Sequence, residues 1–99
     1  MIIIELTYKR SLDEVNKLLP GHRDFLDKYY RERLFLASGP KSPRDGGIIL
    51  AMGNRATINK ALEEDPFYQH EIADYRVIEF EPNKYSDEFK NILGIKNTN

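Results

Sequence analysis

"RLFLASGPKSPRDGGIILAMG", residues Arg33–Gly53, decides the fold, because it holds two apolar segments with no helix between them. The first segment, Arg33–Pro40, has the pattern of a strand that Gly39-Pro40 stops. The second, Gly47–Gly53, is short, apolar and bounded by glycines. Between them, Lys41–Gly47 is rich in glycine and proline, which is typical of a turn-rich connection. The centre of the chain therefore predicts two consecutive strands.

A strand and a helical region precede this centre. "IIIELTY", Ile2–Tyr8, is rich in β-branched residues and predicts a strand, with its even-numbered residues on one face and its odd-numbered residues on the other. Ser11, with Glu14 three residues later, resembles a capping box that begins one or two helical turns. Pro20 then ends that helix or begins a second one, and helical spacing continues to about Arg33.

A helix, a strand and a tail follow the centre. Asn54 is a suitable N-cap for a helix over Arg55–Asp65, a pattern that Pro66 ends. "ADYRVIEFEP", Ala73–Pro82, predicts a fourth strand. The C-terminal tail, residues 83–99, predicts a short helix followed by a frayed end.

The element order is therefore β-α-β-β-α-β, within one domain over residues 1–99. This order predicts an α+β ferredoxin-like fold, in which an antiparallel four-stranded sheet carries helices on one face. A sheet with one wet face should alternate apolar and polar residues, yet "III", "LFLA" and "IILAM" are apolar on both faces. We expect a second copy of the sheet to cover the face without helices. The prediction is a homodimer, with a pocket between each sheet and its helices or at the subunit boundary.

Composition narrows the classes of function. The 99 residues are 40% hydrophobic and 31% charged, as in soluble globular proteins. A net charge of −1 and a pI of about 6.1 give no basic excess, so we expect no nucleic-acid partner and no membrane partner. The absence of cysteine excludes disulfides and thiol catalysis. No segment approaches the ~20 apolar residues of a membrane span, and the run at Ile2 is too short for a signal peptide, so a cytoplasmic location is the default expectation.

The triplet His22-Arg23-Asp24 looks like part of a kinase catalytic loop, but the rest of that motif is absent. The asparagine that follows in kinases is missing, and 99 residues cannot hold a kinase fold. Successive helix residues also point in different directions, so the three side chains cannot share one site. Arg23 and Asp24 are expected on a solvated helix face.

His22 itself lies on an apolar stripe with Phe25, Leu26 and Tyr29, so its ring should point inward. A histidine in a pocket suits general acid or base chemistry, because its charge changes near neutral pH. A buried, hydrogen-bonded core histidine would give the same pattern, and periodicity does not separate the two. Neither His22 nor His70 has a ligand-spaced partner, so no metal site is predicted.

Asp65 is the second candidate, because it stands at the end of a predicted helix, where the dipole disfavours a negative charge. A turn before Pro66 is one explanation. The other is that Asp65 orients His22 and stabilises its protonated form. Spacing alone does not show that the two residues meet.

The connection between the two central strands also offers charged residues. Lys41 and Arg44 could form an anion-binding lid over a pocket, or they could lie in a solvated loop. Gly46 and Gly47 do not fit a phosphate-binding loop, and we expect them to serve a turn or a bulge.

The chain resembles the YciI-like, or YCII-related, proteins of the dimeric α/β-barrel superfamily. Five segments carry this resemblance, in family order over nearly the whole chain: "GHRDFL", "LFLASGP", "GGIILA", "ALEEDPF" and "YRVIEFEP". Two positions depart from the family pattern. Many relatives have glycine where this chain has Arg33, and some carry a further histidine in the last strand, where this chain has Tyr75.

The resemblance implies a ferredoxin-like fold, a homodimer and a site in which His22 and Asp65 are the catalytic residues. One branch of the family resembles lyases that eliminate chloride from chlorinated hydroxyquinones. The expected activity is lyase- or isomerase-type proton transfer on a small molecule, with Ser38, Tyr8 and Tyr29 binding the substrate and with no metal or organic cofactor. The alternative is a non-catalytic module of the same fold that binds a small ligand or a partner.

Overall fold

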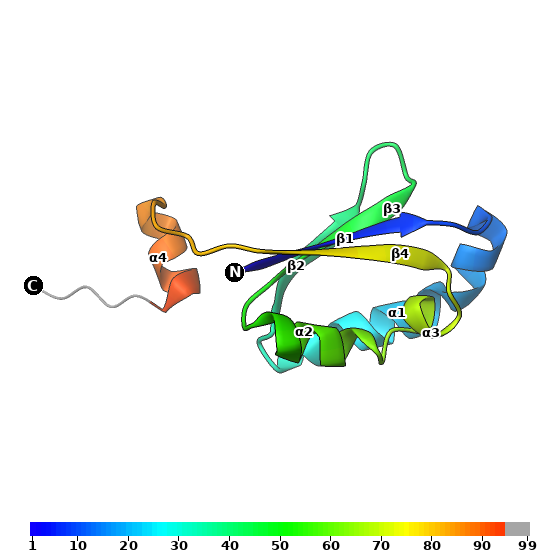
Figure 1. Ribbon diagram of the computed structural model, residues 1–99, viewed down its shortest axis with the longest axis horizontal. Helices are drawn as coiled ribbons and strands as arrows, with labels where there is room; N and C mark the ends of the chain where they lie inside the picture. The colour runs from blue at the N-terminus through cyan, green and yellow to red at the C-terminus, as the bar shows by residue number, and fades with distance from the viewer. Residues whose placement is uncertain (95–99) are drawn as a thin grey trace, which may run out of the picture.

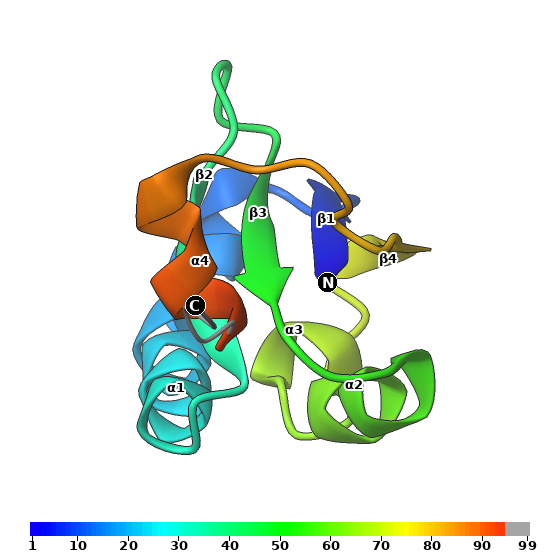
Figure 2. The ribbon, with the colours of Figure 1, turned by 90° about the vertical axis from the view of Figure 1, so that its left-hand side faces the viewer.

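The computed structural model of the protein describes residues 1–94, and its four strands form one antiparallel sheet in the order β2-β3-β1-β4. The helices α1, α2 and α3 lie on one face of this sheet (Figures 1 and 2). The predicted α+β ferredoxin-like fold is therefore confirmed. The elements are β1 (Ile2–Tyr8), α1 (Leu12–Arg31), β2 (Phe35–Pro40), β3 (Gly46–Ala51), α2 (Arg55–Leu62), α3 (Pro66–Gln69), β4 (Ala73–Glu79) and α4 (Asp87–Leu93).

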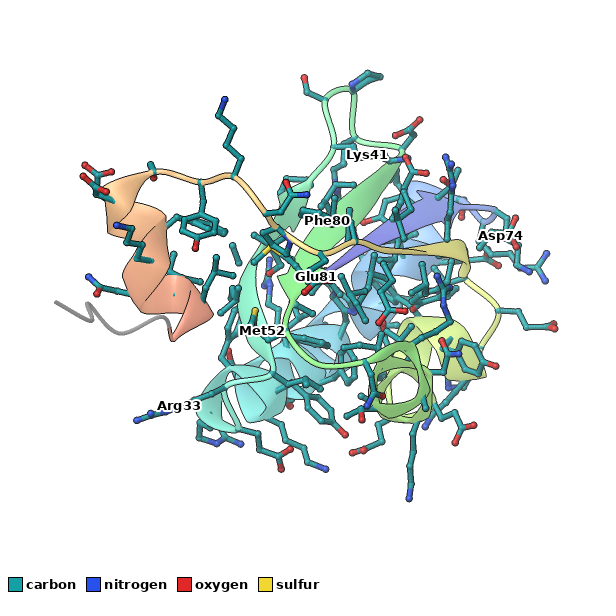
Figure 3. The ribbon with its side chains drawn as sticks, turned by 60° about the vertical axis from the view of Figure 1, so that its left-hand side comes forward. Arg33, Lys41, Met52, Asp74, Phe80 and Glu81 are labelled. Atoms are coloured by element: carbon teal, nitrogen blue, oxygen red, sulfur yellow. The ribbon has the colours of Figure 1, made fainter. Side chains whose placement is uncertain are left out.

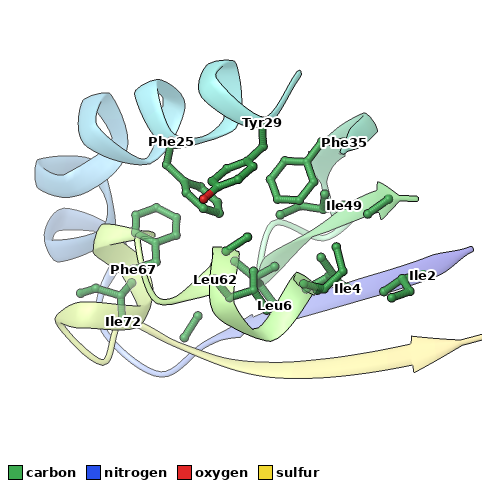
Figure 4. Close-up of a cluster of buried hydrophobic side chains, with 14 of the residues drawn as sticks. Ile2, Ile4, Leu6, Phe25, Tyr29, Phe35, Ile49, Leu62, Phe67 and Ile72 are labelled. Atoms are coloured by element: carbon green, nitrogen blue, oxygen red, sulfur yellow. The ribbon is translucent and has the colours of Figure 1, made fainter. Parts of the chain in front are cut away.

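Strand β1 lies at the centre of the sheet, and its alternation sets which face is buried. Ile2, Ile4 and Leu6 point toward the helices and are almost fully buried, as the two-residue period predicts. Aromatic side chains of α1, β2 and α3 meet these residues in one core (Figure 4). Burial of large apolar side chains of this kind is the main stabilising contribution in a small fold.

Helix α1 runs unbroken through Pro20, so the prediction that this proline ends one helix or begins another is wrong. Ser11 does cap the helix, because its side chain accepts a hydrogen bond from the Glu14 amide at 3.3 Å. A proline inside a helix removes one backbone hydrogen bond and costs about 3 kcal/mol. Val15 before the proline and Phe25 after it are both buried in the same core, so packing holds the two halves of the helix in line.

The helix predicted over residues 55–65 is shorter, and Pro66 begins an element instead of ending one. Helix α2 ends at Leu62, and α3 begins at Pro66. Asp65 is the N-cap of α3, since its side chain accepts a hydrogen bond from the Phe67 amide at 3.0 Å. Proline suits the first position of a helix because the amide it lacks would have no partner there. Asp65 therefore lies where the helix dipole favours a negative charge, which is the opposite of the predicted position.

The face of the sheet away from the helices carries apolar side chains. Ile3 pairs across the strands with Leu50 on one side and with Ile78 on the other, so all three share this outer face. Ile78 is 37% exposed. Beyond the end of β4, an extended segment with Phe80 and Glu81 leads away from the sheet to α4 (Figures 1 and 3). The short helix predicted in the tail is confirmed as α4, and the frayed end predicted over residues 95–99 lies outside the described residues.

Gly46, at the start of β3, is required by the close approach of β1. A Cβ atom at this position would lie 1.7 Å from the carbonyl oxygen of Leu6. Gly39 in β2 has no such restriction, because a Cβ atom there would meet nothing within 4 Å. The two glycines therefore form a matched pair for testing the packing of the sheet.

We predict that Gly46→Ala lowers the free energy of unfolding by about 3 kcal/mol, because the added methyl group forces β1 and β3 apart. Gly39→Ala should change it by no more than about 0.5 kcal/mol. Equilibrium urea unfolding of both variants and the wild type measures the difference. Equal midpoints for the two variants would show that the strands do not approach this closely.

Candidate active site

His22 lies on the inner side of α1 and packs on Phe67 of α3. The two rings are stacked, with centroids 4.1 Å apart and planes 8° from parallel. Gly21 permits this packing, because a Cβ at its position would lie only 3.1 Å from Cγ of Pro66. The His22 side chain is 12% exposed, so the ring points inward, as the apolar stripe predicts, but remains reachable.

The imidazole of His22 meets the carboxyl group of Asp65. Nδ1 of His22 lies 2.8 Å from Oδ1 of Asp65, although the residues are 43 positions apart in the chain. The Asp65 side chain is fully buried. Because an ionised carboxylate can only accept hydrogen bonds, Nδ1 carries the proton in this pair, which fixes the tautomer of the ring.

Asp65 has a hydrogen bond from a donor on each of three elements. Its Oδ1 accepts from the Phe67 amide at 3.0 Å as well as from His22, and its Oδ2 accepts from the Tyr75 hydroxyl at 2.5 Å. Within residues 1–94, no buried side-chain nitrogen or oxygen is left without a partner. A buried carboxylate is tolerated only when it is satisfied in this way.

Tyr75 supplies the bond from β4, where Leu6 of β1 is its cross-strand neighbour on the helix side of the sheet. Burial, followed by the negative charge of Asp65 and the hydrogen bond to it, raises the pKa of Tyr75 far above its usual range. The hydroxyl therefore stays protonated at neutral pH and acts as a permanent donor to Asp65.

A cavity of about 350 Å³ lies beside the His22 ring, between α1 and the inner face of β1 and β3. This is the first of the two predicted positions, between the sheet and its helices. Leu6, Leu26 and Phe67 contribute apolar wall, and His22 contributes its ring. Since Nδ1 is engaged with Asp65, Nε2 is the nitrogen of His22 that remains for a ligand.

The three predicted substrate-binding residues are placed differently from one another. Tyr8 and Ser38 line the cavity, and Ser38 Oγ lies 2.5 Å from the hydroxyl of Tyr30. Tyr29 does not line it. The Tyr29 ring is buried in the core (Figure 4), and its hydroxyl donates a hydrogen bond to Glu64. Tyr29 is therefore not placed to bind a ligand in this cavity.

Sequence reasoning overlooked Tyr75 and expected Arg23 on a solvated helix face, whereas it named Arg44 as part of a possible anion-binding lid over a pocket. Tyr75 shares the parity of Ala73 and Val77 along β4, so the two-residue period of the strand places all three on the inner face, and that signal was available in the sequence. Arg23 and Arg44 line the cavity from α1 and from the β2–β3 connection. No periodic pattern reports their position, because one belongs to an exposed helix face and the other to a loop.

Residues 1–94 contain no cluster of three or more His, Cys, Asp or Glu side chains placed to hold a metal ion. They also contain no helix with the length and hydropathy needed to cross a membrane.

Comparison with known proteins identifies the family. The YCII-related domain matches residues 1–81. The chain belongs to the YCII-related family. The solved structure of 5-chloro-2-hydroxyhydroquinone dehydrochlorinase (TftG) from Burkholderia phenoliruptrix AC1100, in complex with 2,5-dihydroxybenzoquinone, is similar to this member at 15% identity and a TM-score of 0.68. The match covers 82% of this chain and 94% of that one, and it supports the fold. No curated protein matches the sequence.

We predict that Tyr75→Phe lowers the free energy of unfolding at pH 7 by about 1–3 kcal/mol, because Oδ2 of Asp65 loses its donor in a buried place. The stability of the wild type should also fall above pH 10. There the unfolded chain releases the Tyr75 proton at its ordinary pKa while the folded chain retains it. Urea unfolding at pH 7 and between pH 9 and about 11 tests both effects.

The matched control is Tyr68→Phe, since Tyr68 is exposed and its ring contacts that of Tyr75. This control should leave stability at pH 7 unchanged within about 0.5 kcal/mol. It should also keep the alkaline slope of the wild type, whereas Tyr75→Phe should reduce that slope and leave the part that comes from Tyr29, whose pKa burial also raises. If the two variants behave alike, the hydroxyl of Tyr75 does not support Asp65.

Proposed function

We propose that this YCII-related protein is an enzyme that catalyses proton transfer on a small, cyclic, oxygenated compound, in an elimination or an isomerisation. The observation that carries the proposal is a histidine held by a buried carboxylate at the wall of a cavity. A core histidine would explain the packing, but it would not require a cavity beside the ring. His22 is the general acid/base in this proposal, and Asp65 is its positioning residue.

The elimination follows from the tautomer of the pair. The lone pair of Nε2 takes a proton from a substrate carbon, the electrons of that C–H bond form a C=C bond, and the neighbouring C–X bond breaks to release X⁻. The imidazolium that results is stabilised by the adjacent Asp65 carboxylate, 2.8 Å from Nδ1. In an isomerisation, the same proton returns to a different substrate atom. The step needs no redox partner, and the proposed enzyme uses no organic cofactor.

Ser38 and Tyr8 are proposed to bind substrate oxygens, because both line the cavity that His22 borders. The hydroxyl of Tyr30 lies 2.5 Å from Ser38 Oγ and would orient it. Two hydroxyl groups and an imidazole beside apolar side chains suit a small ring with oxygen substituents.

The structural neighbour supports this choice of reaction class. TftG is named a dehydrochlorinase, an enzyme that removes the elements of HCl, and its structure holds 2,5-dihydroxybenzoquinone. At 15% identity the likeness extends to the fold alone. Because that neighbour is named a dehydrochlorinase, we propose ring elimination as the first reaction to assay, with chlorinated hydroxyquinones as the first substrates.

A homodimer is the second part of the proposal, and it rests on the outer face of the sheet. Ile3, Leu50 and Ile78 form an apolar strip there, on the side opposite the helices. Apolar side chains on an exposed sheet face favour packing against a second layer. The same sheet of another copy of the chain is the simplest such layer.

We predict that His22→Gln lowers kcat by about 10²–10⁴-fold on any substrate found in such a panel, because the proton acceptor is lost. Asp65→Asn should also reduce kcat, since an amide can present its NH₂ group to Nδ1 and so disturb the tautomer. His70→Gln is the matched control, because His70 is exposed and outside the cavity, and it should retain full activity. Steady-state kinetics and circular dichroism of each variant provide the measurements.

Two results would contradict the assignment. Undiminished kcat in the folded His22→Gln variant would remove the general base. Tight binding of panel compounds without any turnover would instead favour a ligand-binding module of the same fold.

We predict that Ile78→Lys converts the homodimer to a monomer, because a charge on the outer face opposes burial against a second sheet. Thr57→Lys is the control, since this exposed residue lies on α2, on the opposite side of the sheet. Sedimentation equilibrium over a range of protein concentrations reports the mass of each variant. A wild type that stays monomeric at the highest concentration would rule out the dimer.

A further inference from the structure

The cavity beside His22 is lined by positive charge and by no negative charge. Arg23 of α1 and Arg44 of the β2–β3 connection both contribute to its wall. Among residues 1–94, no aspartate or glutamate contributes to it. The chain as a whole has 16 acidic and 15 basic residues, so this separation is local and does not follow from composition.

Arg44 is held at the cavity without being neutralised. Its Nη2 donates a hydrogen bond to Oδ1 of Asn16 on α1 at 2.8 Å, which fixes the guanidinium between the connection and the helix. The partner is a neutral amide, and the remaining donors of a guanidinium stay available in such a contact.

Lys41, the other cation of this connection, is engaged elsewhere. Its Nζ lies 3.6 Å from Glu5 and 3.5 Å from Asp45, and it donates to the hydroxyl of Thr7 at 3.2 Å. Figure 3 places Lys41 beside the sheet, at the start of the connection. Of the two cations that the sequence offered for an anion-binding lid, the structure therefore favours Arg44 alone.

Arg23 adds a second guanidinium next to His22 in the chain. Within the described residues, neither Arg23 nor Arg44 has a carboxylate within 4.0 Å. The planar fork of a guanidinium matches the two oxygens of a carboxylate or a similar delocalised anion. Two guanidinium groups at one small cavity, without an acidic residue in its wall, favour a ligand that carries a negative charge.

The apolar side chains of the cavity wall and the cavity volume indicate what the uncharged part of the ligand is. Leu6, Leu19, Leu26 and Phe67 are apolar, and about 350 Å³ is at the small end of ligand-binding cavities. A single ring with one charged group fits this volume and this surface.

We infer that the cavity binds a small monocyclic organic anion, with its ring on the apolar wall and its charged group paired with Arg44 and Arg23. This inference rests on the proposed function, because it assigns a substrate class to the same cavity. Arg44 is its specificity-determining residue, and Arg23 assists it. A substrate held in this way would present its ring to Nε2 of His22.

The test compares benzoate with benzamide, which have nearly the same shape and differ in charge. Each is titrated into the full-length ¹⁵N-labelled protein, and the dissociation constant is taken from amide chemical-shift changes. Benzoate should bind at least about tenfold more tightly than benzamide, as expected for a hydrogen-bonded charge pair. Arg44→Gln should remove most of this preference. Arg31→Gln is the control, because it removes the same charge from α1 outside the cavity and should leave the preference intact.

Every outcome bears on the inference. Equal affinity for the two compounds, saturation by neither compound, or a preference that survives Arg44→Gln would overturn it. The proposed function fails separately, through turnover. A protein that prefers benzoate through Arg44 but turns over no compound keeps the anion site and loses the enzyme. A protein that turns over neutral rings but shows no preference for benzoate keeps the proposed enzyme function and loses the anion site.

Discussion

A fully buried carboxylate, that of Asp65, is the group on which the arrangement of this protein depends. An ionised group away from water is tolerated only with a complete set of donors, and removal of one donor leaves an uncompensated charge. Here the donors come from α1, from the start of α3 and from β4, and the donor on α1 lies 43 positions from Asp65 in the chain. The bonds can form together only when helix, turn and strand are all in place. The same contacts that make Asp65 tolerable therefore also fix the orientation of His22.

The position of Asp65 also shapes what a ligand meets. The carboxylate lies behind the imidazole, so His22, and not the acid, borders the cavity. Its negative charge is engaged with His22 and Tyr75 and does not oppose an anion at the mouth. Arg44, held by the neutral amide of Asn16, also borders this cavity.

Much of the fold could be predicted from the sequence, because the signals that determine it are local. The two-residue period of β1 assigned its faces correctly, and the strand pair around the β2–β3 connection established the topology. Pro20 and Pro66 were misassigned because proline restricts a helix start and a helix interior in different ways, and tertiary packing decides between them. The core of Val15 and Phe25 carries α1 through Pro20, and the burial of Asp65 makes Pro66 the start of α3.

The candidate site was harder to predict, because its geometry arises from contacts between elements. His22 and Asp65 could be named from the sequence, but their 2.8 Å separation depends on how α3 packs against α1. Tyr29 shares the apolar stripe with His22, yet it turns to Glu64, since a stripe on a long helix faces different neighbours along its length. Tyr75 was noted only for the histidine that some relatives have there. Tyr75 keeps its proton and donates it in the hydrogen bond to Asp65, a part that the sequence alone did not indicate.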